Sequence, residues 1–146
     1  MRYKLEVLAT VTLIIGLIGH ASAQQCSTRT TTGKYAVVCD GFLTPAPGAP
    51  LVPARGLAVA TADRKGNFTG SGTISIGGTI LQQAVTGTEQ LNPDCTGTIT
   101  YEQTIDGQPG PPLDITFFVS QDGNIIDGLT VDPGTVFACK LTRTKD

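Results

Sequence analysis

The side chains best able to do chemistry in this 146-residue chain are four cysteines, Cys26, Cys39, Cys95 and Cys139. Their spacings of 13, 56 and 44 residues lack the Cys-x-x-Cys pairs that are typical of a four-cysteine zinc site. An even number of cysteines in a short exported chain is instead typical of a disulfide framework. We therefore expect two disulfides and no metal site.

Conventional catalytic groups are scarce. The single histidine, His20, lies within the first 23 residues, so a processed chain has no imidazole to serve as the general base of a Ser-His-Asp or Cys-His arrangement. The carboxylates mostly fall in expected turns, as at Asp94, Asp106, Asp122 and Asp132, where solvated acids are common. We predict no catalytic residues and no cofactor.

Residues 1–23 have the pattern of a secretory signal peptide. Arg2 and Lys4 precede an apolar run over residues 7–18, and Ala21-Ser22-Ala23 supplies the small residues of a cleavage site. Because Gln25 rather than a small residue precedes Cys26, cleavage after Ala23 is favoured over lipid attachment. The sequence thus predicts a secreted or periplasmic protein of bacterial type, with one domain over residues 24–146 and no membrane span after cleavage.

The charge balance argues against a nucleic-acid partner. Ten basic residues oppose 12 acidic ones, for a formal net charge of −2, and no stripe of lysine and arginine is present. The 18 glycines and nine prolines, set among β-branched residues, are typical of a small exported β protein.

Alternating apolar and polar residues predict eight strands and no helix after residue 23, with residues 24–32 extended. The expected strands are residues 33–43, 56–62, 67–75, 79–91, 96–104, 113–120, 125–131 and 135–142. Short turns between them favour antiparallel neighbours. An eight-stranded up-and-down barrel is therefore predicted, with a β-sandwich as the alternative.

This topology favours one pairing of the cysteines. In a closed barrel the first and last strands are neighbours, which brings Cys39 beside Cys139, while Cys26 and Cys95 both lie at the opposite end. The other two pairings stay open.

Strand alternation also predicts which side chains face the interior. These are Phe68, Ile74, Ile99, Tyr101, Ile115, Phe117, Val119 and Phe137. Gly70 and Gly72 on the same face would leave space for a ligand, although an ordinary packed core, with the glycines easing the coiling of the strands, is the favoured interpretation of these two residues.

Residues 44–55 contain four prolines, which predicts a stiff, exposed loop. Such a loop would present Leu51, Val52 and Arg55 to a protein partner, or would cap the core.

Three segments together resemble a known group: residues 67–72, residues 85–98 from Val-Thr-Gly-Thr to Asn-Pro-Asp-Cys-Thr-Gly-Thr, and Asp-Pro-Gly-Thr-Val at 132–136. They are similar to bacterial secreted proteins of the allene oxide cyclase barrel-like group, within the calycin-type β-barrels. The resemblance spans roughly residues 33–143 and carries no catalytic fingerprint. It implies an eight-stranded barrel whose interior holds a small apolar molecule.

Three functional hypotheses follow. The first is a non-catalytic barrel that binds a small apolar ligand. The second, implied by the resemblance alone, is an isomerase or cyclase with Tyr101 as its polar group. The third is a surface-interaction or inhibitor module that uses the loop at residues 44–55.

Overall fold

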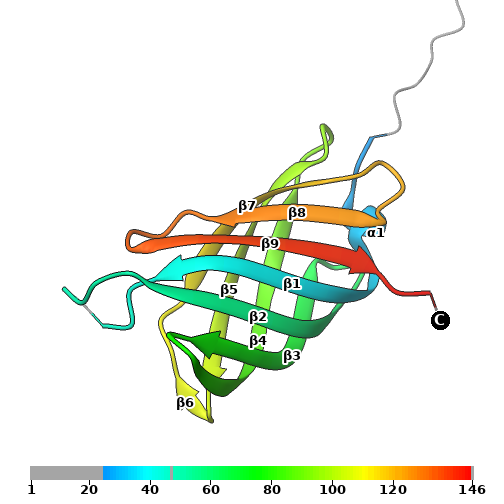
Figure 1. Ribbon diagram of the computed structural model, residues 1–146. Helices are drawn as coiled ribbons and strands as arrows, with labels where there is room; N and C mark the ends of the chain where they lie inside the picture. The colour runs from blue at the N-terminus through cyan, green and yellow to red at the C-terminus, as the bar shows by residue number, and fades with distance from the viewer. Residues whose placement is uncertain (1–24, 47, 146) are drawn as a thin grey trace, which may run out of the picture.

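The computed structural model describes residues 25–46 and 48–145, so the predicted signal peptide lies outside the described residues. One short helix and nine strands follow each other along the chain (Figure 1). They are α1 (Thr28–Thr31), β1 (Gly33–Leu43), β2 (Val52–Ala62), β3 (Asn67–Ile76), β4 (Thr79–Leu91), β5 (Thr96–Ile105), β6 (Gln108–Pro109), β7 (Leu113–Val119), β8 (Ile125–Thr130) and β9 (Thr135–Arg143).

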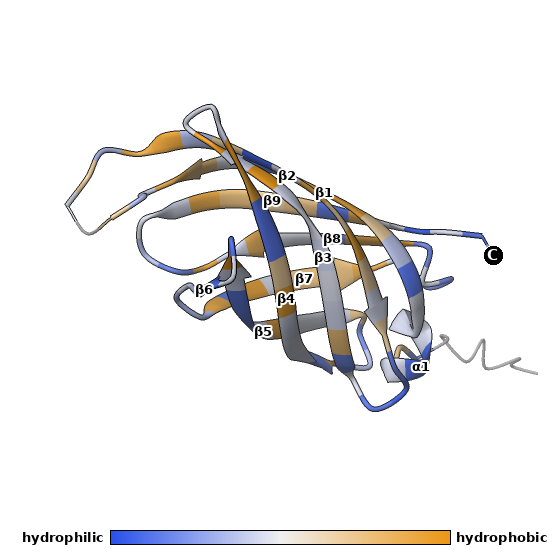
Figure 2. Ribbon diagram, turned by 90° about the horizontal axis from the view of Figure 1, so that it is seen from below, coloured by the Kyte–Doolittle hydropathy of each residue, from blue (hydrophilic) through white to orange (hydrophobic). Residues whose placement is uncertain are grey.

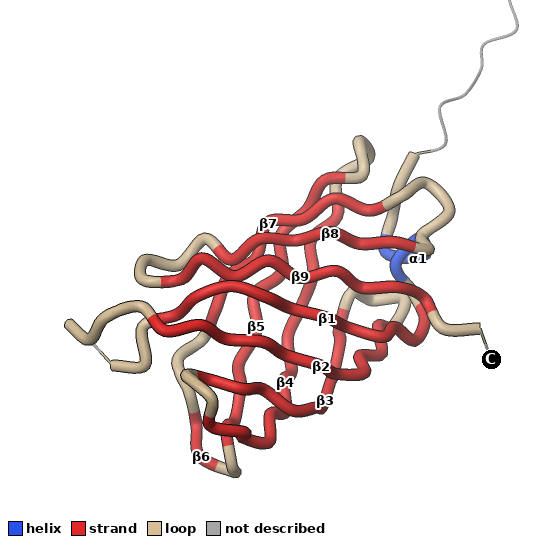
Figure 3. The backbone as a smooth tube through the Cα atoms, viewed as in Figure 1, coloured by secondary structure: helices blue, strands red, loops and turns tan. Residues whose placement is uncertain are grey.

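Eight of these strands close into an antiparallel barrel. From β1 to β5, each strand pairs with the next along the chain. β5 then pairs with β7, β7 with β8 and β8 with β9. β9 pairs with β1 and so closes the barrel. β6 is an additional two-residue strand that pairs only with the end of β5, and it lies at the lower left in Figure 3. The predicted up-and-down barrel is confirmed, and the sandwich alternative is wrong.

Side chains alternate between the interior and solvent along each strand, as the sequence pattern predicts. In β5, Ile99 and Tyr101 are buried while Thr98 and Thr100 are exposed. Apolar and polar residues accordingly alternate along the strands in Figure 2. Since the strand period is two, this alternation fixes which residues can line the interior.

Gly87 of β4 is required by close approach to β5. It lies opposite Tyr101 in the register, and a Cβ at this position would lie 2.3 Å from the Thr100 carbonyl oxygen and 2.7 Å from the Tyr101 Cβ. The absence of a side chain at Gly87 therefore lets β5 carry Tyr101 into the interior.

The segment at residues 44–55 is only partly a loop, which corrects the prediction. β2 begins at Val52, so Val52, Pro53 and Arg55 belong to a strand. Proline is tolerated there because the ladder between β2 and β3 begins only at Ala54. At Pro53 the carbonyl oxygen accepts from the Gly77 N–H at 2.8 Å, and no ladder bond requires a proline N–H. The Arg55 side chain is paired with Asp40 at 3.1 Å and is not displayed from a loop.

Residues 26–32 form what we call the N-terminal plug, which closes one end of the barrel. The plug includes α1, so the prediction of an extended segment without helix is wrong there. Figure 1 shows α1 at the end of the barrel opposite the loop that follows β1. The turn is short and held by tertiary contacts, and a four-residue helix leaves no periodic signal in a sequence.

Both disulfides have the favoured pairing. Cys39 and Cys139 lie directly opposite each other on β1 and β9, with 4.0 Å between their Cα atoms. Cys26 is bonded to Cys95, which ties the N-terminal plug to the turn between β4 and β5. Two such bridges are typical of a protein that folds in an oxidising compartment.

Within residues 25–46 and 48–145, no helix is long and apolar enough to cross a membrane.

Candidate functional site

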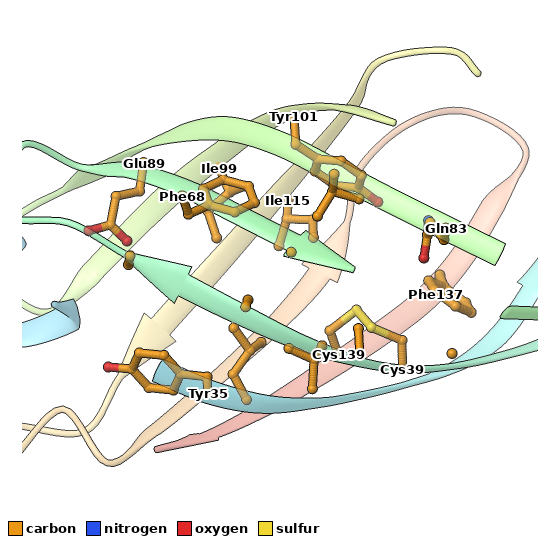
Figure 4. Close-up of a pocket in the computed structure, with 18 residues that line it drawn as sticks. Tyr35, Cys39, Phe68, Gln83, Glu89, Ile99, Tyr101, Ile115, Phe137 and Cys139 are labelled. Atoms are coloured by element: carbon orange, nitrogen blue, oxygen red, sulfur yellow. A yellow bond between two sulfur atoms is a disulfide. The ribbon is translucent and has the colours of Figure 1, made fainter. Parts of the chain in front are cut away.

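An inner chamber of about 110 Å³ lies in the middle of the barrel (Figure 4). This volume is several times what one ordered water needs, roughly 10–15 Å³. Its wall comes from β1 to β5, β7 and β9. The lining residues are Tyr35, Val37, Cys39, Gly56, Ala58, Ala60, Ala62, Phe68, Gly70, Gln83, Val85, Glu89, Ile99, Tyr101, Ile115, Phe137, Cys139 and Leu141. The chamber is wide because β2 contributes only glycine and alanine to it.

A second space, the mouth cavity, continues from the inner chamber to the end of the barrel opposite the plug. It measures about 490 Å³, and Thr44, Pro45 and Pro111 lie at its rim. Gln83, Tyr101 and Phe137 line both spaces and so mark the boundary between them. A molecule entering from the mouth therefore passes these three side chains before it reaches the inner chamber.

The structure places all eight residues predicted to face the interior inside the barrel and divides them among three locations. Phe68, Ile99, Tyr101, Ile115 and Phe137 line the inner chamber, and Ile74 lines the mouth cavity. Phe117, like the neighbouring Val119, is buried in the core and lines neither space.

The two glycines singled out by the sequence differ in role. Gly70 lines the chamber. A Cβ at Gly72 would lie 2.1 Å from the Leu57 carbonyl oxygen, so that glycine permits close strand packing and opens no space.

Tyr101 presents its hydroxyl to the open space at the boundary. The hydroxyl has no hydrogen-bond partner in the described part of the chain, and no fully buried side-chain nitrogen or oxygen there lacks one, so the Tyr101 oxygen touches the cavity. Burial, with a smaller contribution from the negative charge of Asp132, raises the pKa of Tyr101 to about 12. At neutral pH the hydroxyl is therefore a hydrogen-bond donor and is not available as a base.

Two glutamines beside Tyr101 form a fixed chain of hydrogen bonds. Gln103 donates from Nε2 to the Pro111 carbonyl oxygen at 3.1 Å, and Gln83 donates from Nε2 to Gln103 Oε1 at 2.8 Å. Because the Pro111 carbonyl only accepts, each amide has one orientation. The Oε1 atom of Gln83 is left free at the boundary.

The polar groups at the closed end of the chamber are hydrogen-bonded to the plug and to the turn between β7 and β8. The Tyr35 hydroxyl donates to the Gly123 carbonyl oxygen at 2.9 Å. The Arg143 guanidinium lies over the Tyr35 ring, 5.0 Å from its centroid, and donates to carbonyl oxygens of Thr30, Thr32 and Gly123. Arg143 thus holds the plug and does not line the chamber.

Glu89 is a buried carboxyl group at this closed end. Its side chain accepts a hydrogen bond from Thr31 of the plug, and burial raises the pKa of Glu89 despite that bond. When protonated, Glu89 can donate to Thr31 Oγ1, which in turn donates to the Thr28 carbonyl oxygen at 3.2 Å. The chamber therefore holds a carboxyl group whose pKa lies above its usual value.

Sequence reasoning missed Gln83 and Glu89. Both lie an even number of residues from Leu81, Val85 and Leu91 and so share the face of β4 with them. Strict alternation through this 13-residue strand would therefore have placed both side chains inside. Polar residue type outweighed position in the prediction. Tyr35 was missed because the first strand contains few polar residues to mark its outer face.

The predicted turn acids Asp94 and Asp122, and also Asp63, lie at exposed hairpin turns. Hydrogen bonds to each carboxylate, led by those from Thr96, Ser120 and Asn67 respectively, hold the pKa of each acid below its usual value. Within residues 25–46 and 48–145 there is no cluster of three or more potential metal ligands. The described groups thus offer a binding cavity with a neutral hydrogen-bonding boundary.

Comparisons of the chain with family models, with curated proteins and with solved structures found no match.

Proposed function

We propose that this protein is exported by its leader and binds a small apolar molecule in the barrel interior, without transforming it. The observation that carries the proposal is the open inner chamber, whose wall is apolar apart from Tyr35, Gln83, Glu89 and Tyr101. Ligand sites in proteins are commonly concave, mainly apolar and equipped with a few polar groups that orient the ligand.

The route into the chamber supports binding. The mouth cavity leads from the end of the barrel that the plug does not cover to the chamber, past the shared residues Gln83, Tyr101 and Phe137. An eight-stranded barrel interior is also wide enough to hold one small ligand where side chains do not fill it.

Filling the chamber is the direct test. Ala58 lines the chamber, whereas its neighbour Val59 points to solvent and is 44% exposed. We expect Ala58→Phe to abolish the fluorescence increase of N-phenyl-1-naphthylamine, an uncharged apolar probe, while Val59→Phe leaves it unchanged. Thermal melts establish that both variants fold. Probe binding that survives Ala58→Phe in the folded protein, or absence of binding to the wild type, would contradict the proposal.

A further inference from the structure

The polar groups of the interior are satisfied at one end and free at the other. At the closed end, Tyr35 donates to Gly123, and Glu89 is bonded to Thr31. At the boundary with the mouth, the Tyr101 hydroxyl and Gln83 Oε1 have no partner in the described chain. No fully buried side-chain nitrogen or oxygen lacks a partner in the described residues, so both of these oxygens are accessible from the cavity. A ligand that covers them without bonding to them would leave them unpaired at a cost in free energy, so a polar ligand group is favoured at the boundary.

The two free groups have complementary hydrogen-bonding roles. The Tyr101 hydroxyl carries a proton at neutral pH and donates it, while the free oxygen of Gln83 can only accept. Both residues line both spaces, and Figure 4 shows the Tyr101 hydroxyl pointing toward the end of the chamber where Gln83 lies. The boundary therefore offers a ligand hydroxyl one donor, at Tyr101, and one acceptor, at Gln83.

The charge of the interior discriminates against anions. No lysine or arginine lines the inner chamber or the mouth cavity among the described residues. Arg143 is occupied by three plug and turn carbonyl groups, and the charges nearest the interior are the carboxyl groups of Glu89 and Asp132. A ligand carboxylate at the boundary would be desolvated without a cation to pair with, which is strongly unfavourable.

We propose that the ligand is a neutral amphiphile with a hydroxyl group, its apolar part in the inner chamber and its hydroxyl between Tyr101 and Gln83. This rests on the proposed function and narrows it, since it excludes fatty-acid anions of the same shape. A carbonyl or ether oxygen would use Tyr101 alone and leave Gln83 unpartnered, so it ranks below an alcohol.

Matched eight-carbon ligands test this at pH 7 by isothermal titration calorimetry. We expect 1-octanol to bind at least tenfold more tightly than octanoate and than octylammonium, and more tightly than octyl methyl ether. Equal or tighter binding of octanoate would overturn the inference, as would octylammonium binding more tightly than 1-octanol, which would assign the polar contact to Glu89.

Tyr101→Phe supplies the residue-level test, with Thr98→Val on the outer face of the same strand as its control. Loss of one hydrogen bond predicts an affinity for 1-octanol about 3- to 10-fold lower in Tyr101→Phe, a larger factor than for N-phenyl-1-naphthylamine, which carries no hydroxyl. Thr98→Val removes a hydroxyl from an exposed residue that lines neither space and should leave both affinities unchanged.

The two proposals fail differently. If N-phenyl-1-naphthylamine binds the wild type but Tyr101→Phe leaves 1-octanol affinity unaltered, the neutral-amphiphile inference fails alone. If neither the probe nor 1-octanol binds, the proposed function fails as well.

Discussion

Removing the disulfides one at a time gives a quantitative test of how each supports the barrel. The two double variants are Cys39→Ala with Cys139→Ala, and Cys26→Ala with Cys95→Ala. They are well matched because each deletes two sulfur atoms and each pair includes a buried cysteine, with 8% exposure at Cys139 and 6% at Cys26. Differences between the variants therefore report on where the bridges lie in the fold.

The expected losses follow from the length of chain that each bridge closes. The sequence separations are 100 residues for Cys39–Cys139 and 69 for Cys26–Cys95. In the chain-entropy model these correspond to about 4.7 and about 4.4 kcal/mol of the free energy of unfolding. For a domain of this size, a loss of that order lowers the melting temperature by about 15–20 °C.

Urea unfolding and hydrogen exchange together distinguish the two variants. Both should show a lower midpoint and a larger dependence on urea, because the unfolded chain exposes more surface once a bridge is gone. Only the variant that lacks Cys26–Cys95 should show fast amide exchange in the N-terminal plug under native conditions. A loss below 1 kcal/mol in either variant would refute the chain-entropy reasoning, and a protected plug without Cys26–Cys95 would refute the proposed division of roles.

Three further outcomes are expected. The pKa of Glu89 is raised in the folded protein, so the wild type should lose stability as the pH rises above about 4 and Glu89 ionises. Glu89→Gln should flatten this pH dependence of the free energy of unfolding. Identical curves for the two proteins would contradict this. A chain processed after Ala23 retains only Tyr35 and Tyr101, both with raised pKa values. The rise in tyrosinate absorbance at 295 nm should therefore come at higher pH in the folded protein than in the protein unfolded in urea; coincident transitions would count against the burial of these tyrosines. Gly87→Ala should destabilise the barrel by roughly 1–3 kcal/mol through overpacking against β5, and a neutral effect in urea unfolding would show that the strands relax freely.

The barrel was predictable because the sequence signals for its strands and turns lie in residues that are close together along the chain. Turn residues mark the ends of most strands, and the alternation of Ile99 and Tyr101 with threonines fixes a face for β5. Short connections then leave few topologies, and closure alone explains how Cys39 meets Cys139. These are inferences over neighbouring residues, and they hold wherever nothing distant overrides them.

The errors arose where distant contacts decide the local structure. Pro53 reads as a loop residue, yet it enters β2 because β3 is not paired with the strand at that point. The plug is shaped by Arg143, more than 100 residues away, and by the Cys26–Cys95 bridge. Gln83 acquires its free oxygen only through a hydrogen-bond chain that ends at Pro111.

The pairing of the first strand with the last has a consequence in time. A chain that emerges N-terminus first exposes Cys39 long before Cys139, and at about 5–20 residues per second the intervening 100 residues take about 5–20 s. Cys95 emerges earlier, when β1 to β4 are already available to pair. The Cys26–Cys95 bridge can thus close on a half-built sheet, whereas the Cys39–Cys139 bridge must wait for synthesis to end, and trapping free thiols on chains of increasing length would reveal that order.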